Sequence, residues 1–136
     1  MAAQASEQIC KCGRATPFEL CCGPLLANTA PALTAEALMR SRYTAFVLGD
    51  VDYLQRTWHP DTRPESLTIN PEQRWLGLKV KGTTAGTEQD HEGEVEFVAR
   101  YKIAGRGHRL HERSRFQRLA DDWVYVDGMQ MEKSER

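Results

Sequence analysis

Four cysteines lie close together near the N-terminus, at Cys10, Cys12, Cys21 and Cys22, and the chain contains no others. A Cys-x-Cys pair is thus followed, after eight residues, by an adjacent pair. Four thiolates match the tetrahedral ligand set of Zn²⁺, so we predict a zinc site. Because protein sulfurs would fill every position, the metal would stabilise the fold rather than bind a substrate. The alternatives are free structural thiols, a pair of disulfides and an iron–sulfur cluster.

A carboxylate on an apolar strand face is the second unusual feature. In the segment 108–119, Leu110, Glu112, Ser114 and Phe116 alternate onto one side of an expected strand. Leu110 and Phe116 should face the core, so Glu112 must face it too. A buried carboxylate needs a polar partner or takes up a proton. Arg42 lies on the apolar stripe of an expected helix, so we predict an internal Arg42–Glu112 ion pair.

This pair has two interpretations. A satisfied structural pair is favoured, because such networks perturb ionisation as readily as active sites do. Alternatively, the two groups line a cavity that binds or transforms a small polar ligand. The residues predicted to line that cavity are Arg42, Tyr43, Trp58, His59, Trp75, Glu112 and Ser114. His59 is a candidate acid or base, because histidine side chains can exchange a proton near neutral pH, but no catalytic residue is assigned.

The elements that would position these groups follow from local patterns. Thr34 and Gly49 are typical of a helix start and stop, which predicts a helix between them. A second helix is expected from about residue 51 to 58. Four strands are expected at 75–84, 94–104, 108–119 and 123–129, and the short turns between them predict an antiparallel meander. A turn at 105–107 would place Glu112 beside Ala99 or Tyr101.

The segment 10–30 has few large apolar residues, so it needs a metal to hold a fold. We therefore divide the chain into a zinc-binding module at 1–30 and an α+β domain at 31–136.

Composition limits the function. The net charge of −1 gives no reason to expect nucleic acid, and no apolar run approaches a membrane span. The N-terminus lacks a secretory pattern, so we expect the cytoplasm, where structural disulfides are rare. Arginines 100, 113, 115 and 118 lie among acidic residues, which indicates cross-strand ion pairs on a solvated face rather than an RNA site.

The motifs also resemble known sequences. Residues 10–24, CKCGRATPFELCCGP, resemble the SEC-C motif, the zinc-binding tail of a translocation ATPase. Residues 37–60, ALMRSRYTAFVLGDVDYLQRTWHP, together with LHERSRF at 110–116 and WVYVDG at 123–128, resemble the bacterial YchJ-like family. Members of this family join a SEC-C motif to a nuclear transport factor 2-like (NTF2-like) domain, and their biochemical function is not established.

The resemblance implies an α+β, cystatin-like cone, in which N-terminal helices pack on a curved four-stranded antiparallel sheet. It also implies Zn²⁺ as the cofactor. By analogy with SEC-C, the function expected first is a zinc-stabilised binding or adaptor protein that contacts protein partners, such as ribosome or translocation components, through its module. The alternative is a small-ligand binder or enzyme that uses the cavity around Glu112. The oligomeric state stays open, with a homodimer as one option.

Overall fold

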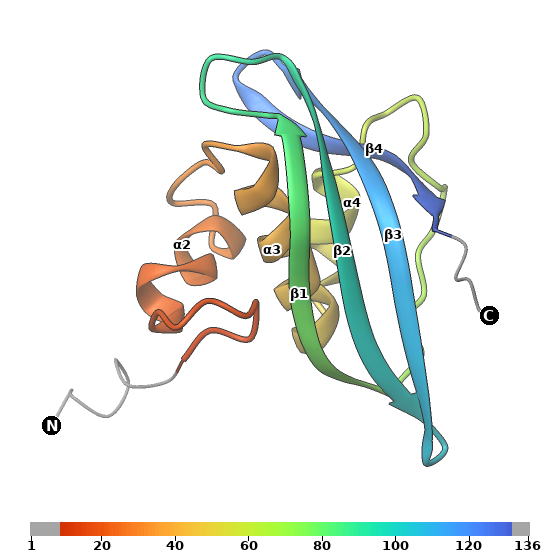
Figure 1. Ribbon diagram of the computed structural model, residues 1–136. Helices are drawn as coiled ribbons and strands as arrows, with labels where there is room; N and C mark the ends of the chain where they lie inside the picture. Colours follow the sequence, from red (N-terminus) through yellow and green to blue (C-terminus); the bar gives the residue numbers. More distant parts are fainter. Residues whose placement is uncertain (1–8, 132–136) are drawn as a thin grey trace, which may run out of the picture.

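The computed structural model describes residues 9–131 and places a small cysteine-containing module before a layer of helices and a sheet (Figure 1). The elements are the single 3₁₀ turn η1 (Phe18–Leu20), α2 (Cys22–Leu26), α3 (Ala35–Leu48), α4 (Val51–Arg56), β1 (Gln73–Ala85), β2 (Glu92–Ile103), β3 (Arg106–Leu119) and β4 (Asp122–Gln130). Within residues 9–131, no helix is long and apolar enough to cross a membrane.

The central helix α3 begins and ends as its sequence predicts. The Thr34 hydroxyl accepts a hydrogen bond from the Ala37 amide at 3.0 Å, and Gly49 closes the helix with a φ of 77°. The next helix, α4, ends at Arg56, two residues earlier than predicted. Trp58 instead forms an isolated parallel bridge with Tyr125 of β4, which holds the following loop against the sheet.

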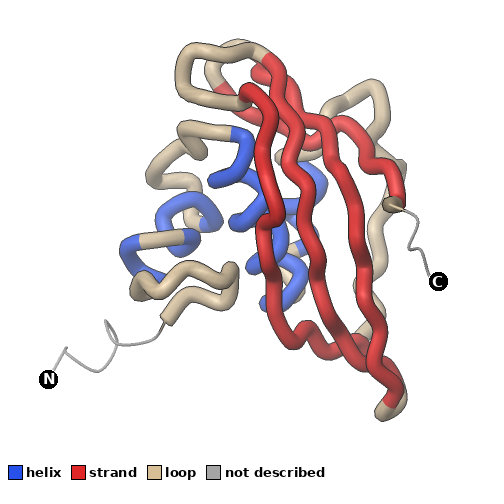
Figure 2. Tube along the Cα trace, in the orientation of Figure 1, coloured by secondary structure: helices blue, strands red, loops and turns tan. Residues whose placement is uncertain are grey.

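The strands form one antiparallel sheet in the order β1-β2-β3-β4. Helices α3 and α4 lie against one face, which we call the inner face, and no helix of residues 9–131 covers the outer face (Figures 1 and 2). Register shifts interrupt β1 in two places, next to Gly77 and next to Gly82. Such bulges bend a strand and increase its twist, which favours the curvature of this sheet around the helices.

The turn between β2 and β3 differs from its prediction. It consists of Ala104 and Gly105, with φ values of 52° and 80°, and not of residues 105–107. Two central residues with positive φ give the tight hairpin turn whose twist suits the flanking strands. Glu112 therefore pairs with Phe97, and the predicted pairing with Ala99 or Tyr101 is wrong. The predicted face of Glu112 is unchanged, because all these partners lie on the inner face.

The core lies between α3 and the inner face of the sheet. Its fully buried large side chains include Leu38, Leu54, Val95 and Phe116, which come from both helices and from the two central strands. Burial of each such side chain contributes roughly 1.5–3 kcal/mol to folding. The predicted architecture of helices packed on a curved four-stranded sheet is confirmed.

Candidate metal centre and inner pocket

The four cysteine sulfurs converge on one point. Their Sγ atoms all lie within 4.8 Å of one another, and those of Cys12 and Cys21 are 3.6 Å apart. A tetrahedral metal with bonds of about 2.3 Å to sulfur requires Sγ–Sγ separations of roughly 3.8 Å. The cluster therefore fits a metal bound by four thiolates.

Local backbone geometry explains how neighbouring cysteines reach the same point. Cys21 and Cys22 stand at the start of α2, where successive side chains need not point to opposite sides as they do in a strand. Cys10 and Cys12 lie on a turn that is closed by a hydrogen bond from the Cys10 amide to the Thr16 carbonyl. The positive φ of Gly13, 99°, belongs to this turn and favours glycine there.

All four cysteines are unbonded in the structure, and their four sulfurs gather at one point rather than in two bonded pairs. Hydrogen bonding from the Cys22 thiol lowers the pKa of Cys12 to about 5, and the same contact raises the pKa of Cys22. Burial raises the pKa of Cys21 to about 11. Cys12 thus takes the negative charge while Cys21 and Cys22 retain their protons. A bound cation would replace those protons, because the thiolate is the form that binds metal.

Helix α3 supplies a residue of this centre that sequence reasoning missed. The fully buried Thr44 hydroxyl donates to the sulfur of Cys22 at 3.5 Å and lies 3.8 Å from that of Cys10. A donor to a ligating sulfur orients the ligand and offsets its charge. The only signal in the sequence is that Thr44, a polar residue, lies among the apolar positions of the helix.

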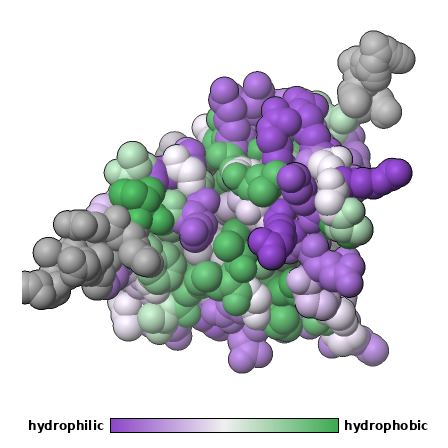
Figure 3. Space-filling view, turned by 90° about the horizontal axis from the view of Figure 1, so that it is seen from below, coloured by the Kyte–Doolittle hydropathy of each residue, from purple (hydrophilic) through white to green (hydrophobic). Residues whose placement is uncertain are grey.

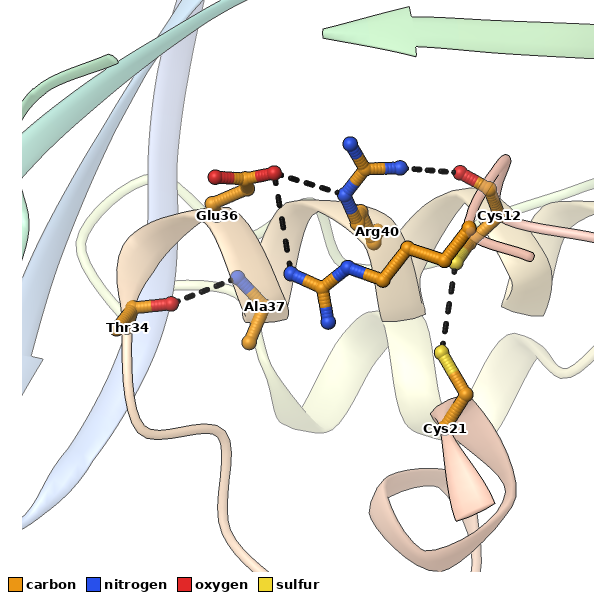
Figure 4. A network of polar contacts seen from close by, with 7 residues as sticks. Cys12, Cys21, Thr34, Glu36, Ala37 and Arg40 are labelled. Atoms are coloured by element: carbon orange, nitrogen blue, oxygen red, sulfur yellow. Dashed lines mark hydrogen bonds and ion pairs between the residues drawn. The ribbon is translucent and has the colours of Figure 1, made fainter. Parts of the chain in front are cut away.

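A second contact from α3 reaches the module backbone. The Arg40 guanidinium donates to the Cys12 carbonyl at 2.7 Å and to the Glu36 carboxylate at 2.9 Å, and Glu36 also lies 3.8 Å from Arg14 (Figure 4). A β carbon at Gly13 would lie 2.8 Å from the Leu78 carbonyl of β1. The module is therefore packed directly on the domain. The division at residue 30 stays a prediction.

A pocket opens between α3 and the inner face of the sheet, with a volume of about 280 Å³. Seen from below in Figure 3, hydrophobic side chains gather across the middle of the molecule. Six of the seven predicted cavity residues line the pocket, which brings Arg42, Tyr43, Trp58, Trp75, Glu112 and Ser114 together. The seventh, His59, is not among the lining residues. Its Nδ1 accepts a hydrogen bond from the Asp61 amide in the loop after α4.

The predicted Arg42–Glu112 ion pair is wrong. Arg42 is buried and donates to the Leu54 carbonyl and the Thr57 hydroxyl, each at 2.8 Å. Its guanidinium carbon also lies 4.6 Å from the ring centroid of Tyr125. Burial lowers the pKa of Arg42 to about 10, so the group keeps its charge at neutral pH. Backbone, hydroxyl and aromatic partners thus satisfy this cation in place of a carboxylate.

Glu112 has partners of its own. Its Oε2 accepts hydrogen bonds from the Ser114 hydroxyl at 2.9 Å and from the Tyr125 hydroxyl at 3.5 Å. Burial, together with the nearby Glu112 charge, raises the pKa of Tyr125 to about 12, so this phenol stays protonated and remains a donor. A β carbon at Gly128 would overlap the Glu112 carboxylate. Gly128 therefore provides the space in which Glu112 lies.

Two tryptophans that line the pocket carry indole donors without a partner among residues 9–131. The Nε1–H groups of Trp58 and Trp75 are buried, and neither makes a hydrogen bond within this part of the chain. Buried polar groups are paired in the great majority of cases, so each exception requires an explanation. Both tryptophans are otherwise well held, Trp58 edge-on to Tyr125 and Trp75 edge-on to Tyr43. Among the described residues, the pocket lining thus combines apolar side chains with one carboxylate and two tryptophans whose buried indole donors are unpaired.

Helices on one face of a curved antiparallel meander, with a pocket between them, define an NTF2-like domain, and the cysteine cluster adds a SEC-C-type module. The family model described as "YchJ, middle NTF2-like domain" matches residues 34–128. A UPF0225 protein of Streptomyces coelicolor is 54% identical, over 88% of this chain and 93% of its own length. A UPF0225 protein of Polaromonas naphthalenivorans is 51% identical, over 89% and 96%.

Solved structures of similar proteins have the same fold. A SEC-C motif containing protein from Rhodopseudomonas palustris has a TM-score of 0.81 at 36% identity, and the match covers 91% of this chain and 99% of that one. A second such protein, from Psychrobacter arcticus, has a TM-score of 0.75 at 27% identity, with coverage of 97% and 88%. The chain belongs to the YchJ-like family of bacterial UPF0225 proteins, as its motifs indicated.

Proposed function

We propose that this protein is a zinc-stabilised binder of a small organic molecule, which enters the inner pocket. The observation that carries the proposal is that Trp58 and Trp75, in the lining of a largely aromatic pocket, have buried indole donors without a partner among residues 9–131. Ligand pockets are mostly apolar and contain a few convergent polar groups that fix orientation. A fitting ligand is flat and apolar, with an acceptor for an indole N–H and a donor for Glu112.

Binding is favoured over catalysis by the lining itself. Among the described residues, no cysteine, histidine or lysine lines the pocket, and Glu112 is its one carboxylate. The Ser114 hydroxyl donates to Glu112 and has no histidine beside it to act as a general base.

The experiment is a fragment screen by ligand-observed NMR and thermal shift, on the metal-loaded protein, with small aromatic amides as probes. A binder should raise the melting temperature of the wild type. Trp75→Phe removes one indole N–H and keeps an aromatic ring, and Glu112→Gln removes the charge at nearly constant shape. Both should weaken the same fragments.

Trp123→Phe is the matched control, because the Trp123 indole already donates to the Leu33 carbonyl and does not line the pocket. If no fragment binds, or if all three variants weaken binding equally, the pocket has no ligand role.

Zinc as the metal is part of this proposal. Four thiolates with every position filled are typical of structural zinc, while an iron–sulfur cluster with the same ligands would absorb visible light. Elemental analysis of the purified protein, together with its visible spectrum, distinguishes the two. One zinc per chain in a colourless protein is the expected result, and iron with sulfide would overturn it.

A protein-contacting role of the module is a second candidate. Leu20, in η1 beside the cysteines, is 74% exposed, so it offers an apolar side chain to a partner surface. Leu20→Glu should abolish such a contact without touching the metal ligands. Leu48→Glu, at the end of α3 and 55% exposed, is the control. Equal recovery of partner proteins with both variants would show that the module surface at Leu20 does not contact them.

A further inference from the structure

The outer face of the sheet is divided into two halves with different charge patterns. In the half near the β1–β2 and β3–β4 connections, strands β2 and β3 place opposite charges directly across from each other, as Glu94 with Arg115 and Glu96 with Arg113. The Arg113 guanidinium lies 3.3 Å from the Glu96 carboxylate, and Arg115 lies 2.7 Å from that of Asp127. This half is the solvated, ion-paired surface that the sequence predicts for Arg113 and Arg115. The same prediction is wrong for Arg100 and Arg118, because over residues 9–131 neither has a carboxylate within 4.0 Å and Arg118 donates to backbone carbonyls instead.

Within residues 9–131, the charged strand residues of the other half are basic. Six exposed basic residues, which we call the basic outer patch, come from three neighbouring strands: Arg74, Lys79 and Lys81 of β1, Arg100 and Lys102 of β2, and Arg109 of β3. Over residues 9–131, none of the six has a carboxylate within 4.0 Å. A shallow groove of about 290 Å³ runs between them, lined by Lys79, Lys81, Arg100 and Arg109 around the buried Val98.

The strand register places like charges opposite each other, which destabilises the sheet of the unbound chain. Arg100 is directly opposite Arg109, and Arg74 is directly opposite Lys102. Like charges in such positions destabilise a sheet, whereas opposite charges stabilise it. A few residues away, strands β2 and β3 instead place opposite charges across from each other. The like-charge pairs are therefore a local feature that a bound anion would neutralise.

We propose that the basic outer patch binds the phosphate backbone of double-stranded RNA. Arginine and lysine bind phosphate through charge-assisted hydrogen bonds, and the two arginines at the centre can each do so with two donors. In the part of the chain that the structure describes, no acidic or aromatic residue lines the groove. Protein interfaces are depleted in lysine at their centre and depend on aromatic anchors, so this surface fits a phosphate backbone better than a protein.

The shape of the surface selects the duplex. The described residues that line this groove include no aromatic side chain, so the groove has no platform for stacked single-stranded bases. The helices lie on the opposite face, so none is available to enter a DNA major groove (Figure 1). Double-stranded RNA is bound mainly by shape, across phosphates and a wide, shallow minor groove. The net charge of −1, which argued against nucleic acid, averages over a surface whose cations are gathered in one place.

The test is fluorescence anisotropy with the full metal-loaded chain and an RNA duplex of about 16 base pairs. With six phosphate contacts, the affinity of the wild type should fall roughly a thousandfold between about 50 and 200 mM salt. The double variant Arg100→Gln/Arg109→Gln should bind more weakly at low salt. Its affinity should fall only about a hundredfold over the same range, because two contacts are lost.

The matched control is Arg113→Gln/Arg115→Gln, which removes the same charge from the ion-paired half of the same face. It should keep the salt dependence of the wild type. Arg109→Glu gives a second readout, since it converts a like-charge pair into an opposite one. It should raise the melting temperature while it weakens RNA binding, so a loss of binding in this variant cannot come from misfolding.

Several results would overturn the proposal. One is the absence of RNA binding at low salt, and another is an equal loss in the Arg113/Arg115 control. Equal affinity for duplex DNA would remove the assignment to RNA. Competition by polyglutamate as strong as that by RNA would show that the patch serves an acidic protein instead.

Discussion

Replacing Thr44 by valine should weaken metal binding without unfolding the domain. The hydroxyl is fully buried and faces the sulfurs of Cys10 and Cys22, so water cannot take its place when it is removed. Four thiolates around a divalent metal carry a formal charge of −2, and loss of a donor leaves that charge less compensated. Loss of such an outer contact typically costs ten- to a hundredfold in metal affinity, or roughly 1.4–2.8 kcal/mol. Valine keeps the shape of threonine, so packing changes little.

The assay is competition for zinc against a chromophoric chelator, together with urea unfolding of the metal-free chain. Thr44→Ser keeps the hydroxyl and loses a methyl group, so it is the matched control. We expect Thr44→Val to lose affinity and Thr44→Ser to retain most of it, with a similar unfolding free energy for both metal-free variants. Wild-type affinity in Thr44→Val, or an equal loss in Thr44→Ser, would refute a role for the hydroxyl.

Two further substitutions test neighbouring contacts. Arg40→Met should lower the unfolding free energy of the metal-loaded protein by about 2 kcal/mol in urea, because a largely buried charged donor to the Cys12 carbonyl is lost. Unchanged stability would show that the module does not depend on this contact. Gly128→Ala should destabilise the chain by about 1–3 kcal/mol and reduce fragment binding, since its β carbon displaces the Glu112 carboxylate. A stable variant with intact binding would contradict the described position of Glu112.

The sequence predicted those elements whose limits depend on residues close together in the chain. The capping threonine and the closing glycine fixed the limits of α3, because each satisfies backbone groups within a few residues. The β2–β3 turn could not be found in this way. Ala104 takes a positive φ that is unusual for alanine, whereas Gly105 and Gly107 are more typical turn residues. The error moved the register but kept alternate residues on the correct face, since a strand alternates with a period of two.

The candidate sites show a similar limit. The cysteines are close in sequence, so their convergence was predictable. Arg42 was correctly placed inside, but its partners were not found, because the Leu54 carbonyl and the Tyr125 ring become available only once α4 and β4 are packed. The role of Thr44 was missed for the same reason, as its sulfur partners are 22 and 34 residues away. Long-range contacts of single polar groups leave no periodic pattern in a sequence.

Helix α3 contacts both the cysteine cluster and the inner pocket, so removal of the metal should also affect the pocket. Arg40 and Thr44 hold the module. The pocket-lining residues of the same helix are Met39, Arg42, Tyr43 and Phe46. Loss of the metal removes the folding free energy of the module and frees one side of α3. We therefore expect chelation to shift the indole N–H signals of Trp58 and Trp75 in nitrogen–proton NMR spectra. Signals that stay in place while elemental analysis shows the metal gone would mean that the pocket holds its shape without the module.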